Sequence, residues 1–219
     1  LGWALGQVMS QQGVTCLLIG RDTRASGLEL AGALASGVVA AGLQVESIGV
    51  APTPAVAWLV AQQSTTAGAV ISASHNPFHD NGVKFFDQRG FKLDDETELA
   101  IEAALLSSTE ITVPQYTMEE NAAGLDRYRD YCVQSVAGGL DLSGLKVVVD
   151  CAHGAMFGVA PAVLRALSAT VLPLHCAPDG ENINAQCGST QPDALARAVL
   201  QEQAEQALVL VAEHQELEL

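Results

Sequence analysis

Hydrophobic residues in this chain gather in short runs that alternate with longer stretches of helical periodicity. The run "TCLLIG" predicts a strand that enters a polar loop, and the stretch from Gly27 to Ala41 predicts the helix that follows it. The same alternation continues to residue 107. The expected strands are 15–20, 44–50 and 67–73, and the expected helices are 1–12, 27–41, 55–63 and 94–107. Strands that alternate with helices indicate a mainly parallel sheet covered on both faces.

Local signals place some of the element ends. Ser26 and Glu29 have the S-x-x-E spacing of a capping box, and Gly42 ends the helix that they begin. Asp94 or Asp95 lies near the cap of the helix that ends at residue 107. The segments "VKFFD" and "FKL" around "QRG" predict a hairpin.

The periodicity fades between residues 107 and 120 and then restarts in a second block. The polar helix "GLDRYRDYCVQSV" leads into "AGGLDLSG", which has the composition of a linker, so we expect domains at 1–138 and 139–219. In the second block the expected strands are 145–150, 170–176 and 207–212, and the expected helices are 155–167 and 193–206. The sequence therefore predicts two consecutive α/β domains with mainly parallel, mixed sheets flanked by helices.

Composition narrows the function classes. The 219 residues are 49% hydrophobic, and 10 Lys and Arg face 25 Asp and Glu, for a net charge of -15. No basic stripe is present, which argues against nucleic acid as a partner, and no apolar run reaches the roughly 18 residues of a membrane span. We expect a cytoplasmic protein whose five cysteines are free thiols rather than zinc ligands. The chain opens in the middle of a helical pattern without Met, so we expect a fragment of a longer protein.

Polar clusters follow three of the expected strands, where parallel α/β sheets bind ligands. They are "RDTR" (21–24), "SASHNP" (72–77) and "DCAHGA" (150–155). In "RDTR", Arg21 and Arg24 could grip a phosphate, but a pairing of Asp22 with one of them, which would hold the loop shut, is the favoured interpretation. In "DCAHGA", His153 is interpreted as a hydrogen-bonded loop residue rather than a ligand.

The cluster "SASHNP" offers a nucleophile. Ser72 or Ser74 at a strand end needs a base or a cation to activate its hydroxyl, and His75 and Lys84 are available. Turns at Asn76-Pro77 and Asn81-Gly82 would return the chain so that Lys84 lies close to the serine. The alternative is a solvated turn with no chemistry, and from the residues alone this alternative is favoured.

A resemblance to a known family changes that balance. The segments "LGWALG", "IGRDTRASG", "PTPAVAWL", "ISASHNPFHDNGVKFF", "KVVVDCAHGA" and "NINAQCGST" occur in this order within residues 1–191. In content and order they resemble the α-D-phosphohexomutases, and the last two favour the branch that acts on glucosamine phosphates. The resemblance implies that Ser74 carries a phosphoryl group that interconverts glucosamine 6-phosphate and glucosamine 1-phosphate through a bisphosphate, for UDP-N-acetylglucosamine synthesis.

The same resemblance implies roles for the neighbouring residues. Ser74, His75 and Lys84 would be catalytic, with Lys84 neutralising charge on the transferring group. Asn76, Arg21 and Arg24 would support the loop and the substrate. A phosphoserine oxygen of Ser74 would ligate Mg²⁺, and the partner would be a phosphorylated amino sugar.

The chain also departs from the family pattern. The family supplies its other Mg²⁺ ligands from a D-x-D-x-D-R loop, which these residues lack, and Glu213, Glu216 and Glu218 do not reproduce its spacing. The family's opening Gly-rich segment with an arginine and its two later domains are not among these residues either. We therefore expect the 219 residues to be inactive by themselves. The alternatives are specificity for mannose or glucose phosphates, or a non-catalytic remnant.

Overall fold

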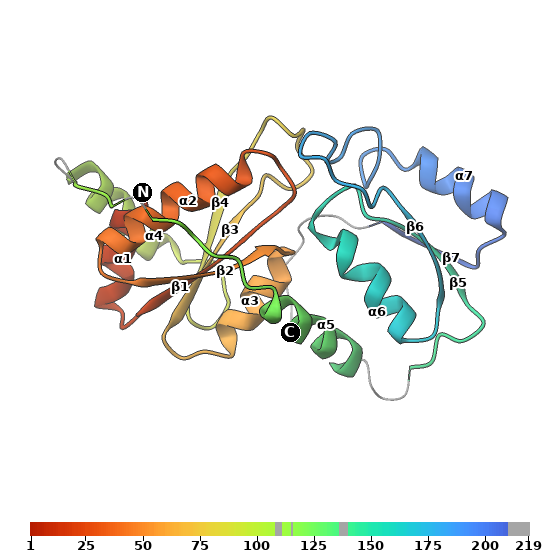
Figure 1. The fold of residues 1–219 in the computed structure, drawn as a ribbon, viewed down its shortest axis with the longest axis horizontal. Coiled ribbons are helices and arrows are strands. Elements are labelled where there is room, and N and C mark those ends of the chain that lie inside the picture. Colours follow the sequence, from red (N-terminus) through yellow and green to blue (C-terminus); the bar gives the residue numbers. More distant parts are fainter. Residues whose placement is uncertain (108–110, 115, 136–139, 210–219) are drawn as a thin grey trace. The chain divides into compact units, whose positions relative to one another are not determined.

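The computed structural model describes residues 1–107, 111–114, 116–135 and 140–209. Chain contacts divide the protein into two units (Figure 1). Unit 1 comprises residues 1–21, 26–72 and 82–124, and unit 2 comprises 22–25, 73–81 and 125–219. Both units contain a parallel or mixed sheet with helices, so the predicted α/β class is confirmed. The predicted domain boundary between residues 138 and 139 lies outside the described residues and stays a prediction.

Unit 1 is built on a four-stranded sheet in the order β2-β1-β3-β4. Strands β1 (Cys16–Arg21), β2 (Gln44–Val50) and β3 (Thr66–Ile71) are parallel, and β4 (Val83–Phe86) is antiparallel to β3. The helices of this unit are α1 (Gly2–Gln11), α2 (Gly27–Ala40), α3 (Thr53–Ala61) and α4 (Asp95–Ser107).

Successive side chains of a strand face opposite sides of the sheet, and both sides of this sheet are covered. Leu17 and Ile19 of β1 pack in one core with α1, α2 and α4. On the alternate positions, Gly20 and Gly68 face Val56 of α3, with no room for larger side chains. Figure 1 accordingly shows α3 on the opposite side of the sheet from α1 and α2.

Helices α1 and α2 approach so closely that their backbones touch. A Cβ atom on Gly37 would lie 2.7 Å from the backbone nitrogen of Trp3, whereas a Cβ atom on Gly32 of the same helix would meet nothing within 4 Å. Gly37→Ala is therefore expected to destabilise unit 1 by about 1–3 kcal/mol, because neither backbone can move away cheaply. Gly32→Ala, its matched control, is expected to stabilise by about 0.5–1 kcal/mol.

Denaturant unfolding followed by tryptophan fluorescence measures both variants, because Trp3 and Trp58 both lie in unit 1. Equal midpoints for the two variants would contradict the close packing of α1 against α2.

Unit 2 contains a three-stranded parallel sheet in the order β6-β5-β7. Val149 of β5 packs with Cys151 and Ala160 in a small core, which Phe157 and Leu164 extend. The strands are β5 (Lys146–Asp150), β6 (Thr170–Leu174) and β7 (Gln206–Val209), and the helices are α5 (Ala123–Ser135), the 3-10 turn η1 (Ala155–Gly158), α6 (Ala160–Ala166) and α7 (Asp193–Glu202). The first residues of α5 belong to unit 1.

Three local predictions have mixed outcomes. The Ser26–Glu29 capping box is wrong, because Ser26 already has helical backbone angles (φ -69°, ψ -14°) and makes no capping hydrogen bond with its side chain. The cap at Asp94 is confirmed, since its carboxylate accepts a hydrogen bond of 2.8 Å from the Thr97 backbone. The hairpin after β4 is reduced to one bridge between Phe86 and Lys92.

The predicted helix 155–167 is divided into η1 and α6. Pro161 lies in the first turn of α6, where its missing N–H costs no hydrogen bond, so a helix begins there rather than continuing through it.

Candidate functional site

The serine loop, residues 73–81, leaves β3 and returns to β4. The backbone N–H of Ser72 donates to the Gly82 carbonyl at 2.9 Å, and within the loop the backbone N–H of Asn76 donates to the Ala73 carbonyl at 3.1 Å. The turn predicted at Asn76-Pro77 is therefore present. Ser72 is only 4% exposed, whereas Ser74 is half-buried and His75 is exposed. Of the two candidate nucleophiles, Ser74 is thus the one that a substrate can reach.

Ser74 has an unusual backbone conformation for its residue type. Its φ angle is 56°, in the left-handed region that disfavours side chains with a Cβ atom and that clusters at functional sites. Its hydroxyl lies 3.4 Å from His75 Nδ1, at the long limit of a hydrogen bond. A serine held in a strained conformation at a strand end has the geometry of a presented nucleophile.

Asp22 and Arg24 form a buried ion pair beneath this loop. The Arg24 side chain is fully buried and donates to the Asp22 carboxylate, which also accepts from the Arg24 backbone at 3.0 Å. Arg24 Nη2 donates to the carbonyls of Ser74 (3.2 Å) and Asn76 (2.7 Å). The Asp22 pairing favoured from the sequence is therefore observed, and Arg24 is not exposed to grip a phosphate from solvent.

Arg21 has a different partner. Its Nε and Nη2 donate to one carboxylate oxygen of Glu120 at 3.1 and 2.9 Å. The two arginines of "RDTR" thus lie in different surroundings, with Arg21 part of unit 1 and Arg24 part of unit 2.

Asp150, at the end of β5, is fully buried and joins three loops. Its carboxylate accepts hydrogen bonds from the Ala152 backbone (2.9 Å), from His175 Nδ1 (2.9 Å) and from the Gly188 backbone (3.0 Å). Each loop contains left-handed residues other than glycine, such as Ala152 and Asn184. This carboxylate therefore fixes the conformation of the segments around it.

His153 behaves as a loop residue, as predicted. Its Nδ1 accepts a hydrogen bond of 3.2 Å from the Ala177 backbone, and burial, with the neighbouring His175 second, lowers the pKa of its imidazole. Its carbonyl accepts a hydrogen bond of 2.6 Å from the Thr23 hydroxyl. These contacts account for its position without a ligand.

The five cysteines are free, as predicted, and three of them are buried. Burial raises the pKa of Cys16 to about 11, and burial followed by the charge of Asp150 raises the pKa of Cys187 to about 11. Burial also raises the pKa of Cys151 far above its ordinary value. These thiols stay protonated near neutral pH, which disfavours a nucleophilic role.

Lys84 lies in β4, opposite Val70 of β3. Burial, followed by the charge of Lys92, lowers the pKa of its ammonium group. Lys84 belongs to unit 1 and Ser74 to unit 2, and the predicted approach of the lysine to the serine stays a prediction.

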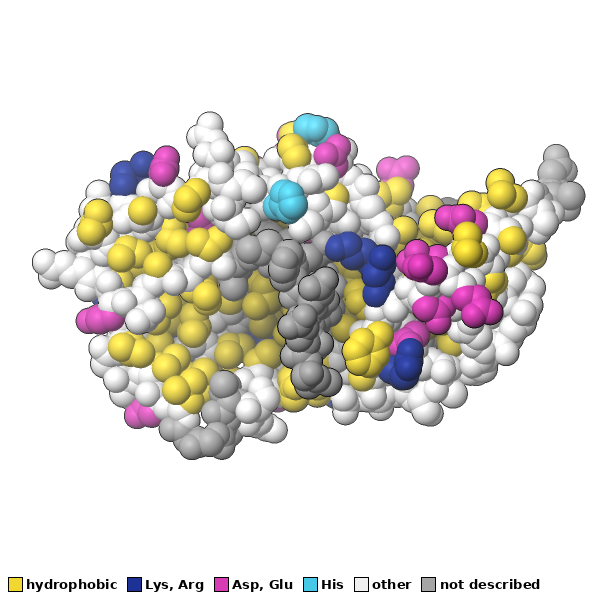
Figure 2. Space-filling model, turned by 180° about the vertical axis from the view of Figure 1, so that it is seen from behind, with side chains coloured by type: hydrophobic (Ala, Val, Ile, Leu, Met, Phe, Trp, Pro, Cys, Tyr) yellow, Lys and Arg dark blue, Asp and Glu magenta, His cyan; other side chains and the backbone are white. Residues whose placement is uncertain are grey.

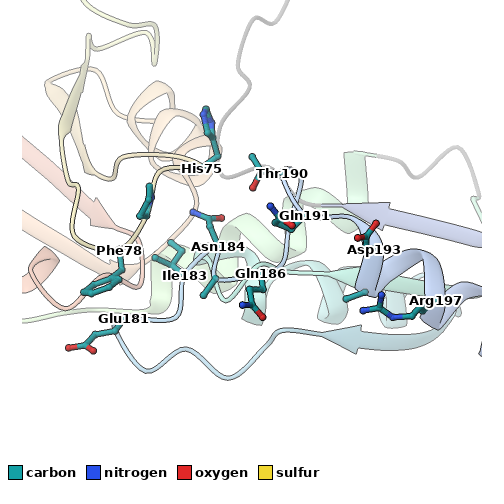
Figure 3. Close-up of a pocket in the computed structure, with 13 residues that line it drawn as sticks. His75, Phe78, Glu181, Ile183, Asn184, Gln186, Thr190, Gln191, Asp193 and Arg197 are labelled. Atoms are coloured by element: carbon teal, nitrogen blue, oxygen red, sulfur yellow. The ribbon is translucent and has the colours of Figure 1, made fainter.

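A pocket of about 750 Å³ opens in unit 2 beside the serine loop (Figure 3). His75 and Phe78 line one end, and the loop and helix from residues 181 to 197 line the rest. Its charged residues are Glu181, Asp193 and Arg197. The lining is polar enough for a hydroxylated ligand, and Ser74 lies next in sequence to its rim.

The available donors do not form a magnesium site. Among the described residues, the one group of three possible metal ligands is Asp150, His175 and Cys187, whose ligand atoms lie within 4.8 Å of one another. Mg²⁺ prefers oxygen ligands in octahedral geometry, whereas this set mixes oxygen, nitrogen and sulfur. The carboxylate of Asp150 also already accepts three hydrogen bonds. Residues 213, 216 and 218 lie outside the described part of the chain.

Two surface properties bear on partners. On the face drawn in Figure 2, Lys and Arg side chains lie in small separate groups beside acidic ones, which is unlike the basic stripe of a nucleic-acid interface. None of the helices in the described ranges has the length and apolar character that a bilayer crossing demands.

Sequence reasoning missed two residues of this site, Asp150 and Asn184. Asn184 Nδ2 donates to the carbonyls of Ser74 (3.0 Å) and Asn76 (3.1 Å). Its segment "NINAQCGST" stands out in the sequence only for its likeness to a family, because a contact across 110 positions leaves no local signal.

Comparison with known proteins gives a consistent result. Residues 1–112 match the family described as phosphoglucomutase/phosphomannomutase, alpha/beta/alpha domain I. The chain is 49% identical over 207 residues to a phosphoglucosamine mutase from Aeromonas hydrophila, covering 92% of this chain and 46% of that protein. It is 47% identical over 214 residues to a phosphoglucosamine mutase from Alcanivorax borkumensis, covering 96% of this chain and 48% of the relative. The chain thus spans about half the length of these relatives.

Solved structures resemble the same fold. A phosphoglucomutase/phosphomannomutase family protein from Burkholderia thailandensis superimposes with a TM-score of 0.78 at 26% identity, covering 96% of this chain and 47% of that one. A structure from Thermus thermophilus, described as a phosphomannomutase by similarity, superimposes with a TM-score of 0.76 at 25% identity, covering 91% and 46%.

Proposed function

Because the chain belongs to the phosphoglucomutase/phosphomannomutase family, we propose that it forms the phosphoserine-bearing part of a phosphoglucosamine mutase. The observation that carries the proposal is Ser74, an accessible hydroxyl in a left-handed conformation at the end of a core strand. The reaction would interconvert glucosamine 6-phosphate and glucosamine 1-phosphate. In its active form Ser74 would carry a phosphoryl group.

The proposed transfer takes place in two halves. The bond between the Ser74 oxygen and phosphorus breaks as the C1 hydroxyl of glucosamine 6-phosphate attacks, and the hydroxyl loses its proton. The resulting 1,6-bisphosphate reorients, and its 6-phosphoryl group returns to the Ser74 oxygen, which releases glucosamine 1-phosphate. His75, 3.4 Å from the Ser74 hydroxyl, is the nearest candidate for moving a proton there.

Positive charge must balance the transferring phosphoryl group. We propose that Lys84 contributes it, with Arg24 and Asn76 supporting the loop and Arg21 held by Glu120. Mg²⁺ is the proposed cofactor, and phosphorylated Ser74 would offer it one oxygen. The chain lacks the D-x-D-x-D-R ligands, so the steps above use only residues that are present.

The partner would be a phosphorylated amino sugar in the cytoplasm. Mannose or glucose phosphate is the second candidate, because a similar solved structure is named for the wider phosphoglucomutase/phosphomannomutase family. A non-catalytic role is the third, and it rests on the missing metal ligands.

A chimera tests the proposal. These 219 residues would replace the matching 207-residue segment of the Aeromonas hydrophila relative, and a coupled assay would follow glucosamine 1-phosphate formation. We expect the chimera to reach kcat/KM within about tenfold of that relative, and the 219 residues alone to give no turnover. A folded chimera without turnover would favour the non-catalytic alternative.

A further inference from the structure

We propose that Asn184 is a positioning residue for phosphoryl transfer, one that holds the serine loop in the conformation that presents the Ser74 hydroxyl. The inference rests on the proposed function for its catalytic part. Its structural part rests on hydrogen bonds within unit 2 alone.

Two donors share the same two acceptors under the loop. Asn184 Nδ2 lies 3.0 Å from the Ser74 carbonyl and 3.1 Å from the Asn76 carbonyl, and Arg24 Nη2 lies 3.2 and 2.7 Å from the same oxygens. A carbonyl oxygen has two lone pairs, so each can accept both bonds. Figure 3 shows the Asn184 side chain directed toward the segment that carries His75 and Phe78. The loop is therefore held by its backbone on both sides of His75.

This arrangement explains how Ser74 keeps its φ angle of 56°. A left-handed conformation costs a residue with a Cβ atom roughly 1–2 kcal/mol, so it persists only where the surroundings enforce it. Holding the carbonyls of Ser74 and Asn76 at fixed points fixes the peptide planes that define this conformation. Without the donors, the segment would relax toward ordinary backbone angles and the hydroxyl would turn away.

Asn184 is itself fixed from below. Its backbone N–H donates to the Ala152 carbonyl at 2.9 Å, and the buried Asp150 carboxylate binds the backbones of Ala152 and Gly188 on either side. Its own φ angle of 59° is one that asparagine tolerates better than most residues. The rigid Asp150 network thus transmits its order to the serine loop through one amide group.

The test uses a nearly isosteric substitution. Asn184→Asp keeps the shape and the left-handed backbone but replaces the shared donor with an acceptor that faces two carbonyl oxygens. Asn184→Gly is the second variant, which removes the donor without adding charge or backbone strain. The matched control is Asn182→Asp in the same loop, which loses its Nδ2 bond to the Ala177 carbonyl (2.9 Å) but has no bond to the serine loop.

Hydrogen exchange in the 219-residue chain gives the first readout. Both Asn184 variants should raise amide exchange within residues 73–81 by about tenfold or more, while exchange in unit 1 stays unchanged. Asn182→Asp should change exchange only near residues 177–182. Unchanged exchange in residues 73–81 for both Asn184 variants would overturn the proposal.

Turnover in the chimera gives the second readout, one that a loss of fold stability alone would not reproduce. The Asn184 variants should lower kcat about 10- to 100-fold with little change in KM, because misplacing a nucleophile by an ångström affects the transfer more than sugar binding. A raised KM with unchanged kcat would instead make Asn184 a substrate-binding residue and contradict the inference. An inactive parent chimera would count against the proposed function, and the exchange result would still decide whether Asn184 holds the loop.

Discussion

Replacing Arg24 with alanine is expected to destabilise the protein by about 3–5 kcal/mol, because the Asp22 carboxylate would stay buried without its partner. Asp22 and Arg24 are 2% and 1% exposed. The guanidinium also holds the carbonyls of Ser74 and Asn76, which would lose a donor. The variant should therefore loosen the serine loop as well as lower stability.

Arg21 in the same motif is the matched control. Its ion pair with Glu120 is partly exposed, at 17% and 37% for the two side chains, so Arg21→Ala should cost no more than about 1 kcal/mol. Thermal unfolding of both variants measures the difference. Similar losses for both would contradict the distinction between the two arginines.

A double variant separates charge from packing. Asp22→Asn combined with Arg24→Met removes both charges and keeps most of the volume, so it should regain a large part of the stability that Arg24→Ala loses. A double variant less stable than Arg24→Ala would show that the ion pair itself, rather than the unpaired carboxylate, decides the cost.

Removing the Ser74 hydroxyl is expected to lower the mutase activity of the chimera by roughly 10³-fold or more, because no other atom takes the place of the phosphoryl acceptor. Ser74→Gly is the preferred variant, since glycine adopts a φ of 56° without strain, whereas Ser74→Ala keeps the strain of a Cβ atom. Circular dichroism should show an unchanged fold.

Ser72→Ala is the control for this pair. Ser72 lies two residues earlier and is 4% exposed, so its loss should affect stability modestly and leave most activity. Retained activity in Ser74→Gly together with inactive Ser72→Ala would exchange the roles of the two serines.

The sequence predicted the strands and helices of this protein well because their signals are local. Hydrophobic runs such as "TCLLIG" are followed directly by helix-forming stretches, and the resulting strands pair in parallel as expected. The Asp22–Arg24 pair was also predictable, since the two residues are two positions apart. The capping box failed because Ser26 enters α2 with helical angles, next to an Ala25 whose backbone bonds Gly180.

The rest of the site depends on contacts that no local pattern encodes. Asn184 reaches Ser74 across 110 positions, and Asp150 binds His175 and Gly188 from separate loops. The left-handed angle of Ser74 is a consequence of these bonds, so it could not be expected from "SASHNP" alone. The choice between Ser72 and Ser74 likewise needed their exposure, which only the folded chain provides.

The most direct test of the account is the position of the phosphate. The chimera would be incubated with glucosamine 1,6-bisphosphate, digested, and its phosphopeptides sequenced by tandem mass spectrometry. The account predicts a single phosphate on Ser74, absent from Ser74→Gly and retained in Ser72→Ala. Phosphate on Ser72, or no phosphate on either serine in a folded chimera, would contradict it.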